Sequence, residues 1–361
     1  MVLEIYQEKV ILERYPKTND ASLRAWSNAE LMLLEYIKDY PSQKVYTFND
    51  RFGVWNCVLK QRDINTVVTY ASQQKAILKN MDLNSLNFDP NFVDPLDKYV
   101  DIDLALIKTP KSLELFELFL HNICKDANEN TEVICCFMTK YFTKKMVIIA
   151  SLYFDVVEQT KAWKKARLMI LKSPKKEILS KKMMNSILFK EKQFFQYYGV
   201  FSSSGIDLGT QFLLKHLSLK KNEINVLDLA CGNGVIGCVI ADQNPDTIIT
   251  FVDDFSLAIA SSKINAVNIK SNFIYADTIE SLKGSNFDVI ISNPPFHFEH
   301  ENNIEVSLSL FKMVFSCLKN GGRFVVVANN HLNYKTHLIK IFSKVQILNQ
   351  NEKFVVYECL K

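Results

Sequence analysis

Alternating apolar runs and helical patterns in residues 224–360 constrain the fold of this chain more than any other feature. Runs such as VLDL, IITFV, DVII and RFVVVA are almost continuously apolar, and segments with helical spacing lie between them. Strands of this kind are buried on both faces, as in a parallel sheet covered by helices. The second half is therefore predicted to be a doubly wound α/β domain, in which ligands bind at the carboxyl ends of the strands.

The first half of the chain repeats the same order more faintly. KVYTFNDRFGVWNCVL, residues 44–59, parallels INVLDLACGNGVIGCVI, with Val45 opposite Val226 and Gly53 opposite Gly234. A length of 361 residues also favours two domains. We predict two copies of one α/β unit, residues 1–180 and 181–361, joined near a lysine-rich stretch that contains Pro174.

The polar positions of the second copy are not shared by the first. Thr47 stands where the second copy has Asp228, Arg51 where it has Gly232, and Lys108 where it has Asn293. Opposite Asp253 the alignment places Ala71 or Ser72. If the second copy binds a small ligand, we expect that the first does not.

A glycine-rich turn follows the first strand of the second copy. Gly232, Gly234 and Gly237 have the spacing G-x-G-x-x-G, and glycine leaves room for a ligand against the backbone. Asp228 lies four positions before Gly232. Its charge would repel a pyrophosphate and attract the ammonium and sulfonium groups of S-adenosylmethionine, which is therefore the predicted cofactor.

Polar residues also end the next three strands. Asp253 can accept hydrogen bonds from two ribose hydroxyls, and Asp277 can accept one from an adenine amine. One such aspartate could simply cap a helix or a turn, but an ordered set at four strand ends favours a site. The predicted cofactor-binding residues are Asp228, Gly232, Asn233, Gly234, Asp253, Asp254, Ala276, Asp277 and Asn293.

The segment SNPPFH, residues 292–297, ends the fourth strand because two prolines cannot continue it. The Asn293 side-chain oxygen and the Pro294 carbonyl can accept the two hydrogens of a planar amine, and Phe296 can stack on a base. His297 could line a base pocket or take a proton, and a purely structural histidine fits equally well. The predicted catalytic residues are Asn293, Pro294, Pro295 and Phe296.

These motifs resemble those of the class I S-adenosylmethionine-dependent methyltransferases, and NPPF is typical of enzymes that methylate a planar exocyclic nitrogen. Over nearly the whole chain, LRAWSNAELMLLEYI, AWKKARLMI, FSSSGIDLG and NEKFVVYECLK resemble the RlmG and RsmC family of ribosomal RNA guanine-N2 methyltransferases. The resemblance implies two tandem Rossmann-like methyltransferase domains with mostly parallel sheets, the first degenerate and without cofactor. It also implies methyl transfer to the N2 amine of a specific guanine in 23S ribosomal RNA that is protein-free or early in assembly.

The same resemblance bears on two local features. It places the loop with Gly205, Asp207 and Gly209 near the methionine end of the cofactor, although a plain helix N-cap is the alternative for Asp207. Ala230 departs from the glycine that the family carries in DLGCGNG. Since alanine adds one methyl group, we expect cofactor binding to survive.

Positive charge gathers in one segment of the first half. Residues 140–182 contain 12 basic and 3 acidic side chains, a net charge of +9. Such a segment suits a polyanion such as RNA, and a solvated face beside a linker is the alternative. The residues predicted to contact RNA are Trp163, Lys164, Lys165 and Arg167, with His297 from the second half.

Other functions fit the same residues. The enzyme could methylate a guanine N2 of small-subunit RNA, an adenine N6 or a protein glutamine. From another class, a non-catalytic RNA-binding ribosome-assembly factor is the alternative, while a nicotinamide dehydrogenase conflicts with Asp228. Eight cysteines without a C-x-x-C pair predict reduced, buried thiols and no metal site. A charged N-terminus and the lack of a long apolar run predict a cytoplasmic, monomeric protein without a membrane segment.

Overall fold

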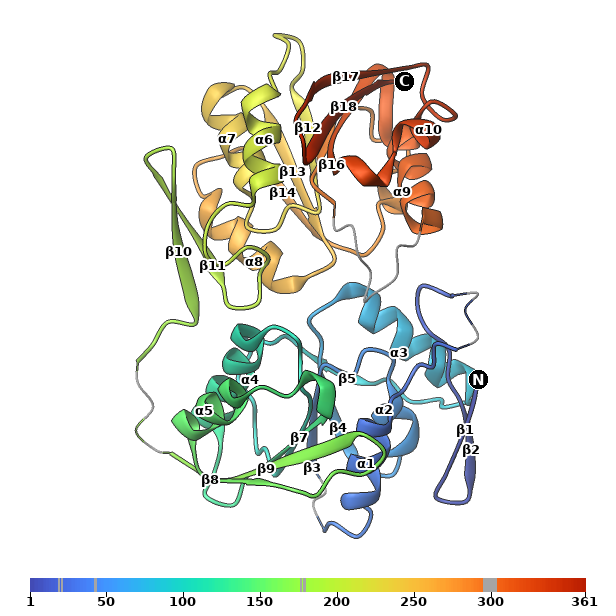
Figure 1. The fold of residues 1–361 in the computed structure, drawn as a ribbon, viewed down its shortest axis with the longest axis vertical. Helices are drawn as coiled ribbons and strands as arrows, with labels where there is room; N and C mark the ends of the chain where they lie inside the picture. The colour runs from blue at the N-terminus through green and yellow to red at the C-terminus, as the bar shows by residue number, and fades with distance from the viewer. Residues whose placement is uncertain (19, 21, 42–43, 176, 178–179, 295–303) are drawn as a thin grey trace. The chain divides into compact units, whose positions relative to one another are not determined.

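The computed structural model describes residues 1–361 apart from 19, 21, 42–43, 176, 178–179 and 295–303, and apart from the side chains of 304–307. The chain folds into two compact units, Met1–Met183 and Met184–Lys361 (Figure 1). The sequence analysis placed the boundary after residue 180. Among the described residues, each unit contains one seven-stranded sheet.

The sheet of the second unit has the strand order β14-β13-β12-β15-β16-β18-β17. Its first five strands are parallel, whereas β18 runs antiparallel to both β16 and β17. The predicted doubly wound, mostly parallel sheet is confirmed, and β17 is a strand that the sequence analysis did not predict. The strands are β12 (Asn225–Leu229), β13 (Ile248–Asp253), β14 (Ser271–Tyr275), β15 (Phe287–Ser292), β16 (Leu318–Asn329), β17 (Lys344–Gln350) and β18 (Phe354–Leu360).

Helices cover both faces of this sheet. Val226 and Val289 pack into a core with α6, α7 and α8, while Leu227 and Ile290, their neighbours in sequence, pack into a second core with α9 and α10. This alternation is the two-residue period of a strand that is buried on both faces. The helices are α6 (Leu208–His216), α7 (Val235–Gln243), α8 (Ser256–Asn265), α9 (Ile304–Cys317) and α10 (Lys335–Leu338).

A β-hairpin precedes α6 in the second unit and was also not predicted. It consists of β10 (Met184–Phe189) and β11 (Lys192–Tyr197). The Asn265 side chain at the end of α8 pairs with the hairpin backbone, since Oδ1 accepts from Phe195 N and Nδ2 donates to Phe195 O, both at 2.8 Å. The hairpin is thus fixed to α8.

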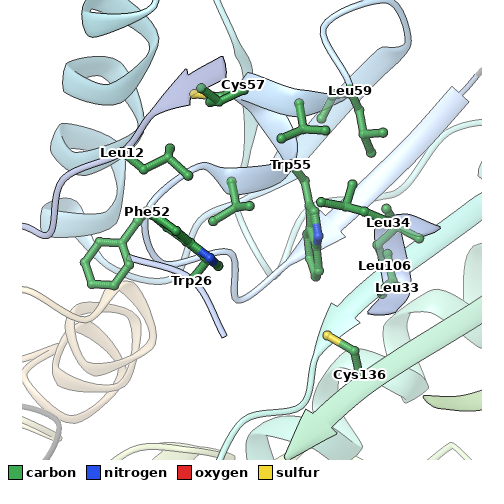
Figure 2. Close-up of a cluster of buried hydrophobic side chains, with 14 of the residues drawn as sticks. Leu12, Trp26, Leu33, Leu34, Phe52, Trp55, Cys57, Leu59, Leu106 and Cys136 are labelled. Carbon is green, nitrogen blue, oxygen red and sulfur yellow. The ribbon is translucent and has the colours of Figure 1, made fainter. Parts of the chain in front are cut away.

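The sheet of the first unit has the strand order β5-β4-β3-β6-β7-β9-β8. One core of this unit lies around Trp55 and includes Leu33 and Leu34 of the first helix (Figure 2). The strands are β3 (Lys44–Phe48), β4 (Asp63–Val67), β5 (Asn91–Val93), β6 (Leu104–Lys108), β7 (Glu132–Met138), β8 (Phe154–Gln159) and β9 (Ala166–Pro174), with a separate hairpin of β1 (Val2–Ile5) and β2 (Glu8–Ile11). The helices are α1 (Asn28–Tyr36), α2 (Val54–Val58), α3 (Ala71–Leu83), α4 (Leu113–Asp126) and α5 (Lys144–Tyr153).

The two units share one topology, position for position along the sheet. Gly53 and Gly234 each cap a helix in the left-handed conformation, with φ of 73° and 78°. The strand registers correct one part of the sequence alignment. Thr47 pairs with Thr66 and Asp228 pairs with Phe251, so Val68 rather than Ala71 or Ser72 is the counterpart of Asp253. The alignment assumed a constant offset, but the connection between the first two strands differs in length.

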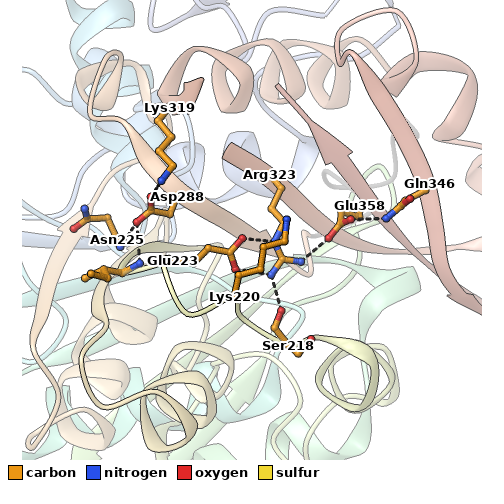
Figure 3. A network of polar contacts seen from close by, with 10 residues as sticks. Ser218, Lys220, Glu223, Asn225, Asp288, Lys319, Arg323, Gln346 and Glu358 are labelled. Atoms are coloured by element: carbon orange, nitrogen blue, oxygen red, sulfur yellow. Dashed lines mark hydrogen bonds and ion pairs between the residues drawn. The ribbon is translucent and has the colours of Figure 1, made fainter. Parts of the chain in front are cut away.

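A buried polar network holds the amino-terminal end of the second sheet (Figure 3). The Arg323 guanidinium donates to Glu223 at 2.7 and 2.8 Å and to Glu358 at 2.5 Å. All three side chains are buried. The Asp288 carboxylate accepts from the backbone N–H groups of residues 224 and 225, which fixes the entry into β12. This end of the sheet lies opposite the strand ends that carry the predicted site.

Two predictions about composition can be compared with the structure directly. All eight cysteines are free and buried, as expected for reduced thiols that behave as small apolar side chains. Burial raises the pKa of Cys135 and Cys238, so these thiols stay protonated at neutral pH. In the part of the chain that the structure describes, no helix is long and apolar enough to span a bilayer.

Candidate active site in the second unit

The predicted site residues follow four strands that are neighbours in the second sheet. The chain order reverses at β12, because β13 and β14 lie on one side of it and β15 and β16 on the other. Ligands of doubly wound sheets bind at such a switch point, outside the carboxyl ends of the strands. The structure therefore brings the glycine-rich turn, Asp253, Asp277 and Asn293 to one edge.

The glycine-rich turn between β12 and α7 uses its two central glycines differently. A Cβ on Gly234 would lie 2.9 Å from the Ser262 Cβ, so this glycine permits close packing of α7 on α8. A Cβ on Gly232 would meet no atom of the described residues within 4 Å, although its φ of 55° also favours glycine. Gly232 thus leaves open space beside the backbone, which is what the approach of a ligand requires.

Asp228 lies beneath this turn and is fully buried. Its Oδ2 accepts from Gly237 N at 2.9 Å, and no described residue donates to its Oδ1. Burial raises the pKa of this carboxyl to about 8, while the bond from Gly237 opposes the shift and the charge of Asp253 adds to it. A buried acceptor that has no cationic partner in the described part of the chain fits the binding of a positively charged ligand.

Asp253 ends β13 and ties the strand to the glycine-rich turn. Its Oδ2 accepts from Gly232 N and its Oδ1 accepts from Phe255 N, both at 2.9 Å. Burial raises the pKa of this carboxyl to about 6. A carboxylate has about four acceptor positions, so these two bonds do not exhaust its capacity to accept from a ligand hydroxyl. Ala276 N donates to Asp253 O at 3.0 Å, which places Ala276 and the half-buried Asp277 next to it.

Asn293 follows β15, and its amide is held from one side. Nδ2 donates to Asp207 Oδ2 at 3.0 Å and to Thr210 Oγ1 at 2.8 Å. None of the described residues donates to Oδ1. Asp207 is also the N-cap of α6, since the same Oδ2 accepts from Gly209 N and Thr210 N. Both interpretations of Asp207 thus have support: it caps a helix, and it lies at the predicted site.

Asn233 differs from the other predicted cofactor residues. Its buried side chain points into the protein, where Nδ2 donates to Gln196 Oε1 at 2.9 Å and Oδ1 accepts from Val235 N at 3.2 Å. The backbone oxygen of Asn233 accepts from Asn265 at 2.8 Å. Gln196 and Asn265 therefore support the turn, and the sequence carried no local signal for either because β11 and α8 are remote from it.

Part of the catalytic segment lies outside the described residues. Pro294 is described and buried. Pro295, Phe296 and His297 belong to the undescribed range, so their predicted roles stay predictions.

The predicted RNA-contacting residues of the first unit form the tight turn between β8 and β9. Trp163 and Ala166 exchange backbone hydrogen bonds across it, and Lys164 and Lys165 occupy the turn with φ of 44° and 63°. Trp163 is 41% exposed, and the Lys164 ammonium lies 4.6 Å from the centre of its ring. Arg167 is half-buried and donates to Gln159 at 3.2 Å. His297 lies outside the described residues, so its predicted contact with RNA stays a prediction.

The corresponding strand ends of the first unit are filled by its own side chains. Arg51, the counterpart of Gly232, lies with its guanidinium carbon 4.6 Å from the centre of the Tyr70 ring. Lys108, the counterpart of Asn293, forms an ion pair with the buried Glu30 at 3.0 Å. Arg51 thus occupies the position that Gly232 leaves open in the second unit, and Lys108 occupies the position at which Asn293 offers an acceptor oxygen.

Comparison with known families agrees with this geometry. Residues 191–358 match the family model of the methyltransferase small domain. The second unit is therefore similar to the methyltransferase small domain. Residues 1–176 match the RLMG N-terminal domain, so the methyltransferase domain follows a unit that has its own family model. S-adenosylmethionine, the predicted cofactor, is the methyl donor that such a domain implies.

One solved structure confirms the two-unit fold. The 16S rRNA N2 G1207 methyltransferase (RsmC) of T. Thermophilus, in complex with AdoMet and guanosine, aligns with a TM-score of 0.78 and 18% identity. The alignment covers 100% of this chain and 97% of that one. A methyltransferase from Pyrococcus furiosus aligns over 42% of this chain and 80% of its own, with a TM-score of 0.36 and 19% identity.

Proposed function

We propose that this protein transfers a methyl group from S-adenosylmethionine to the exocyclic N2 amine of a guanine in 23S ribosomal RNA. The observation that carries the proposal is the Asn293 amide, whose nitrogen is committed to Asp207 and Thr210 while its oxygen accepts from no described residue. An acceptor fixed at the switch point of a methyltransferase sheet is suited to hold an amine hydrogen.

The residues of this chain would act by holding the amine. The guanine N2 amine is a weak nucleophile because its lone pair is delocalised into the ring. Asn293 Oδ1 and the Pro294 carbonyl would accept its two hydrogens, orient the nitrogen and stabilise the positive charge that develops on it. The bound cofactor supplies an electrophilic methyl group. The target base must be unpaired or lifted out of its helix to reach such a site.

The cofactor would lie along the other strand ends. Asp253 would accept from ribose hydroxyls and Asp277 from the adenine amine, and Gly232 would allow close backbone approach. The buried Asp228 carboxyl would favour a cationic ligand. For Asn233, whose side chain is engaged with Gln196, we propose that only the backbone lies near the cofactor.

The choice of guanine in large-subunit RNA is supported by the combination of domains. An amide and a carbonyl acceptor would equally suit adenine N6 or a protein glutamine. The RLMG N-terminal domain, together with the fold shared with an rRNA guanine-N2 methyltransferase, favours guanine in ribosomal RNA. That neighbour acts on 16S RNA, so a small-subunit guanine is the second candidate.

Nucleoside mass spectrometry tests the reaction and the substrate together. The protein is incubated with S-adenosylmethionine and with protein-free 23S RNA, protein-free 16S RNA or assembled subunits, and the digested RNA is analysed. We expect N2-methylguanine in protein-free 23S RNA, lost by at least about 100-fold in Asn293→Ala. Asn272→Ala, an exposed asparagine on β14, is the matched control and should retain activity.

Three other outcomes would replace the proposal. N2-methylguanine in 16S RNA alone would assign the small subunit. N6-methyladenine without N2-methylguanine would assign an adenine enzyme. If calorimetry detects no binding of S-adenosylmethionine by the wild-type protein, the non-catalytic assembly factor becomes the better description.

We also propose that the first unit binds RNA through the β8–β9 turn. The turn presents the exposed Trp163 ring beside Lys164 and Lys165, and Lys165 O accepts from Thr139 N at 2.8 Å, which joins the turn to the loop after β7. That loop carries Tyr141, an aromatic ring 42% exposed, with a lysine ammonium 4.8 Å from the ring centre. Aromatic rings flanked by lysines suit stacked bases and their phosphates.

Charge reversal tests this second proposal. Replacing Lys164, Lys165 and Arg167 by glutamate should weaken RNA binding and lower the slope of log affinity against log salt by roughly 2 to 3, since each phosphate contact contributes about 0.7 to 0.9. The control variant reverses three exposed lysines elsewhere in the same unit, namely Lys9, Lys38 and Lys98. Equal affinities and slopes for both triple variants would contradict the assignment.

A further inference from the structure

The orientation of the Asn293 amide is determined by a single carboxylate. Asp207 Oδ2 accepts from Asn293 Nδ2, and a carboxylate can only accept, so the nitrogen of the amide must face it. Thr210 Oγ1 accepts the second hydrogen at 2.8 Å. A rotation of the amide by 180° would bring the Asn293 and Asp207 oxygens together and lose the bond to Asp207, whereas the Thr210 hydroxyl could turn to donate to the amide oxygen. We expect the rotated amide to be rarer by roughly 100-fold.

The first unit also links its first helix to its fourth strand, but it uses other residue types to do so. Ser27 is the N-cap of α1 and Glu30 stands three residues after it, as Asp207 and Thr210 stand at the start of α6. Val45 pairs with Leu104 and Val226 with Val289, so Lys108 is the counterpart of Asn293. The first unit therefore joins its first helix to its fourth strand by the Glu30–Lys108 ion pair.

The contrast separates a structural link from a functional one. Glutamate and lysine connect the helix and the strand, yet the lysine ammonium at the position of Asn293 can only donate hydrogen bonds. Asp207, Thr210 and Asn293 make the same connection and commit only the NH₂ group, so the amide oxygen stays available. Scaffolding alone does not need this choice of residues.

We infer that Asp207 and Thr210 are positioning residues that hold the Asn293 amide with its oxygen toward the substrate amine. The inference rests on the proposed function for its catalytic consequence, but the orientation itself can be measured separately. Loss of either positioning contact should lower the rate of methyl transfer. Loss of the Thr210 contact should also leave cofactor affinity nearly unchanged, because Thr210 is not among the predicted cofactor-binding residues.

Conservative variants test the two residues. Thr210→Val removes the acceptor without changing the shape of the side chain, and Thr210→Ser restores the hydroxyl. Asp207→Ser keeps a helix cap but is too short to reach Asn293. The matched control is Thr247→Val, because Thr247 is also buried and its hydroxyl donates to Asn244 O at 2.8 Å, away from the site.

The expected kinetic signature is a fall in rate without a fall in affinity. In single-turnover reactions, Thr210→Val should be slower by roughly 10-fold and Asp207→Ser by roughly 100-fold. Thr210→Ser should restore most of the rate. For Thr210→Val, the dissociation constants for S-adenosylmethionine and for RNA should stay within about threefold of the wild type, as for Thr247→Val. Rates within twofold of the wild type for both Thr210→Val and Asp207→Ser would overturn the inference.

A second readout does not depend on catalysis. In the full chain labelled with nitrogen-15, the side-chain NH₂ signal of Asn293 is assigned by its loss in Asn293→Ala. Its hydrogen exchange should be protected in the wild type and at least about 10-fold faster in Asp207→Ser. Unprotected exchange in the wild type would refute the positioning contacts. If the exchange responds as expected while the wild type forms no N2-methylguanine, the proposed function fails and the positioning of the amide holds.

Discussion

Replacing Asp228 by asparagine should change how the stability of the second unit depends on pH. The carboxyl is fully buried, no cation among the described residues lies against it, and its pKa is raised to about 8. The unfolded chain loses this proton near pH 4, whereas the folded chain keeps it to about pH 8. Between these pH values the folded state binds more protons than the unfolded state, so the free energy of unfolding falls as pH rises.

The size of the effect follows from the two pKa values. Each pH unit between about 4 and 8 lowers the free energy of unfolding by about 1.4 kcal/mol. At pH 7 this loss amounts to on the order of 4 kcal/mol. The asparagine variant has no such loss and keeps an acceptor for Gly237 N. Its NH₂ group replaces the unpartnered Oδ1 and costs roughly 1–3 kcal/mol at every pH. The variant should therefore be the less stable protein at pH 5 and the more stable one, by roughly 2 kcal/mol, at pH 7.5.

Denaturant unfolding at pH 5, 6, 7 and 8 measures this difference. Circular dichroism follows both units, while tryptophan fluorescence follows only the first, because Trp26, Trp55 and Trp163 all precede residue 184. The fluorescence transition is thus an internal control that Asp228→Asn should not shift. Parallel stability curves for wild type and variant across this pH range would refute the reasoning about the buried carboxyl.

The same variant should lose cofactor affinity while it gains stability. A cation bound near Asp228 favours the ionised carboxylate, so binding of S-adenosylmethionine at pH 7 should release a proton. Calorimetry in buffers of different ionisation enthalpy measures that release. Asp228→Asn should bind at least about 10-fold more weakly and without the buffer dependence. Equal affinity in the variant would show that the carboxyl does not serve the cofactor.

Three further substitutions have outcomes set by the structure. Ala230→Gly should stabilise the second unit by roughly 0.5–1 kcal/mol in denaturant unfolding, because Ala230 holds a φ of 59° that glycine adopts without strain; a loss of stability would contradict this. Gly237→Ala should destabilise the second unit by roughly 1–3 kcal/mol, since the new Cβ would lie 2.4 Å from Phe251 Cε1. An unchanged midpoint of denaturant unfolding would show that the Phe251 ring moves to accommodate the methyl group. Arg323→Met should cost roughly 3–5 kcal/mol, because two buried glutamates lose their cation; the cost should shrink at acidic pH, where they can protonate.

The order of strands and helices in the second unit could be predicted because it depends on local pattern. The apolar run before Gly232 and the glycines after it determine β12, the turn and α7 without reference to the rest of the chain. The strand at residues 344–350 escaped prediction because it is an edge strand with few buried side chains. The hairpin of residues 184–197 escaped for the same reason.

The sequence by itself determined which residues end the strands, and so which residue types meet at the switch point. Only the tertiary structure decided how those residues are held. Asn293 is held by Asp207 and Thr210, which lie 86 and 83 positions earlier in the sequence. Arg323, the cation that pairs with Glu223, lies 100 positions after it. Likewise, the pKa of Asp228 depends on burial under a turn that packs against α8. Pattern specifies an element through its neighbours in sequence, whereas the direction of an amide and the charge of a carboxyl depend on atoms that folding brings to them.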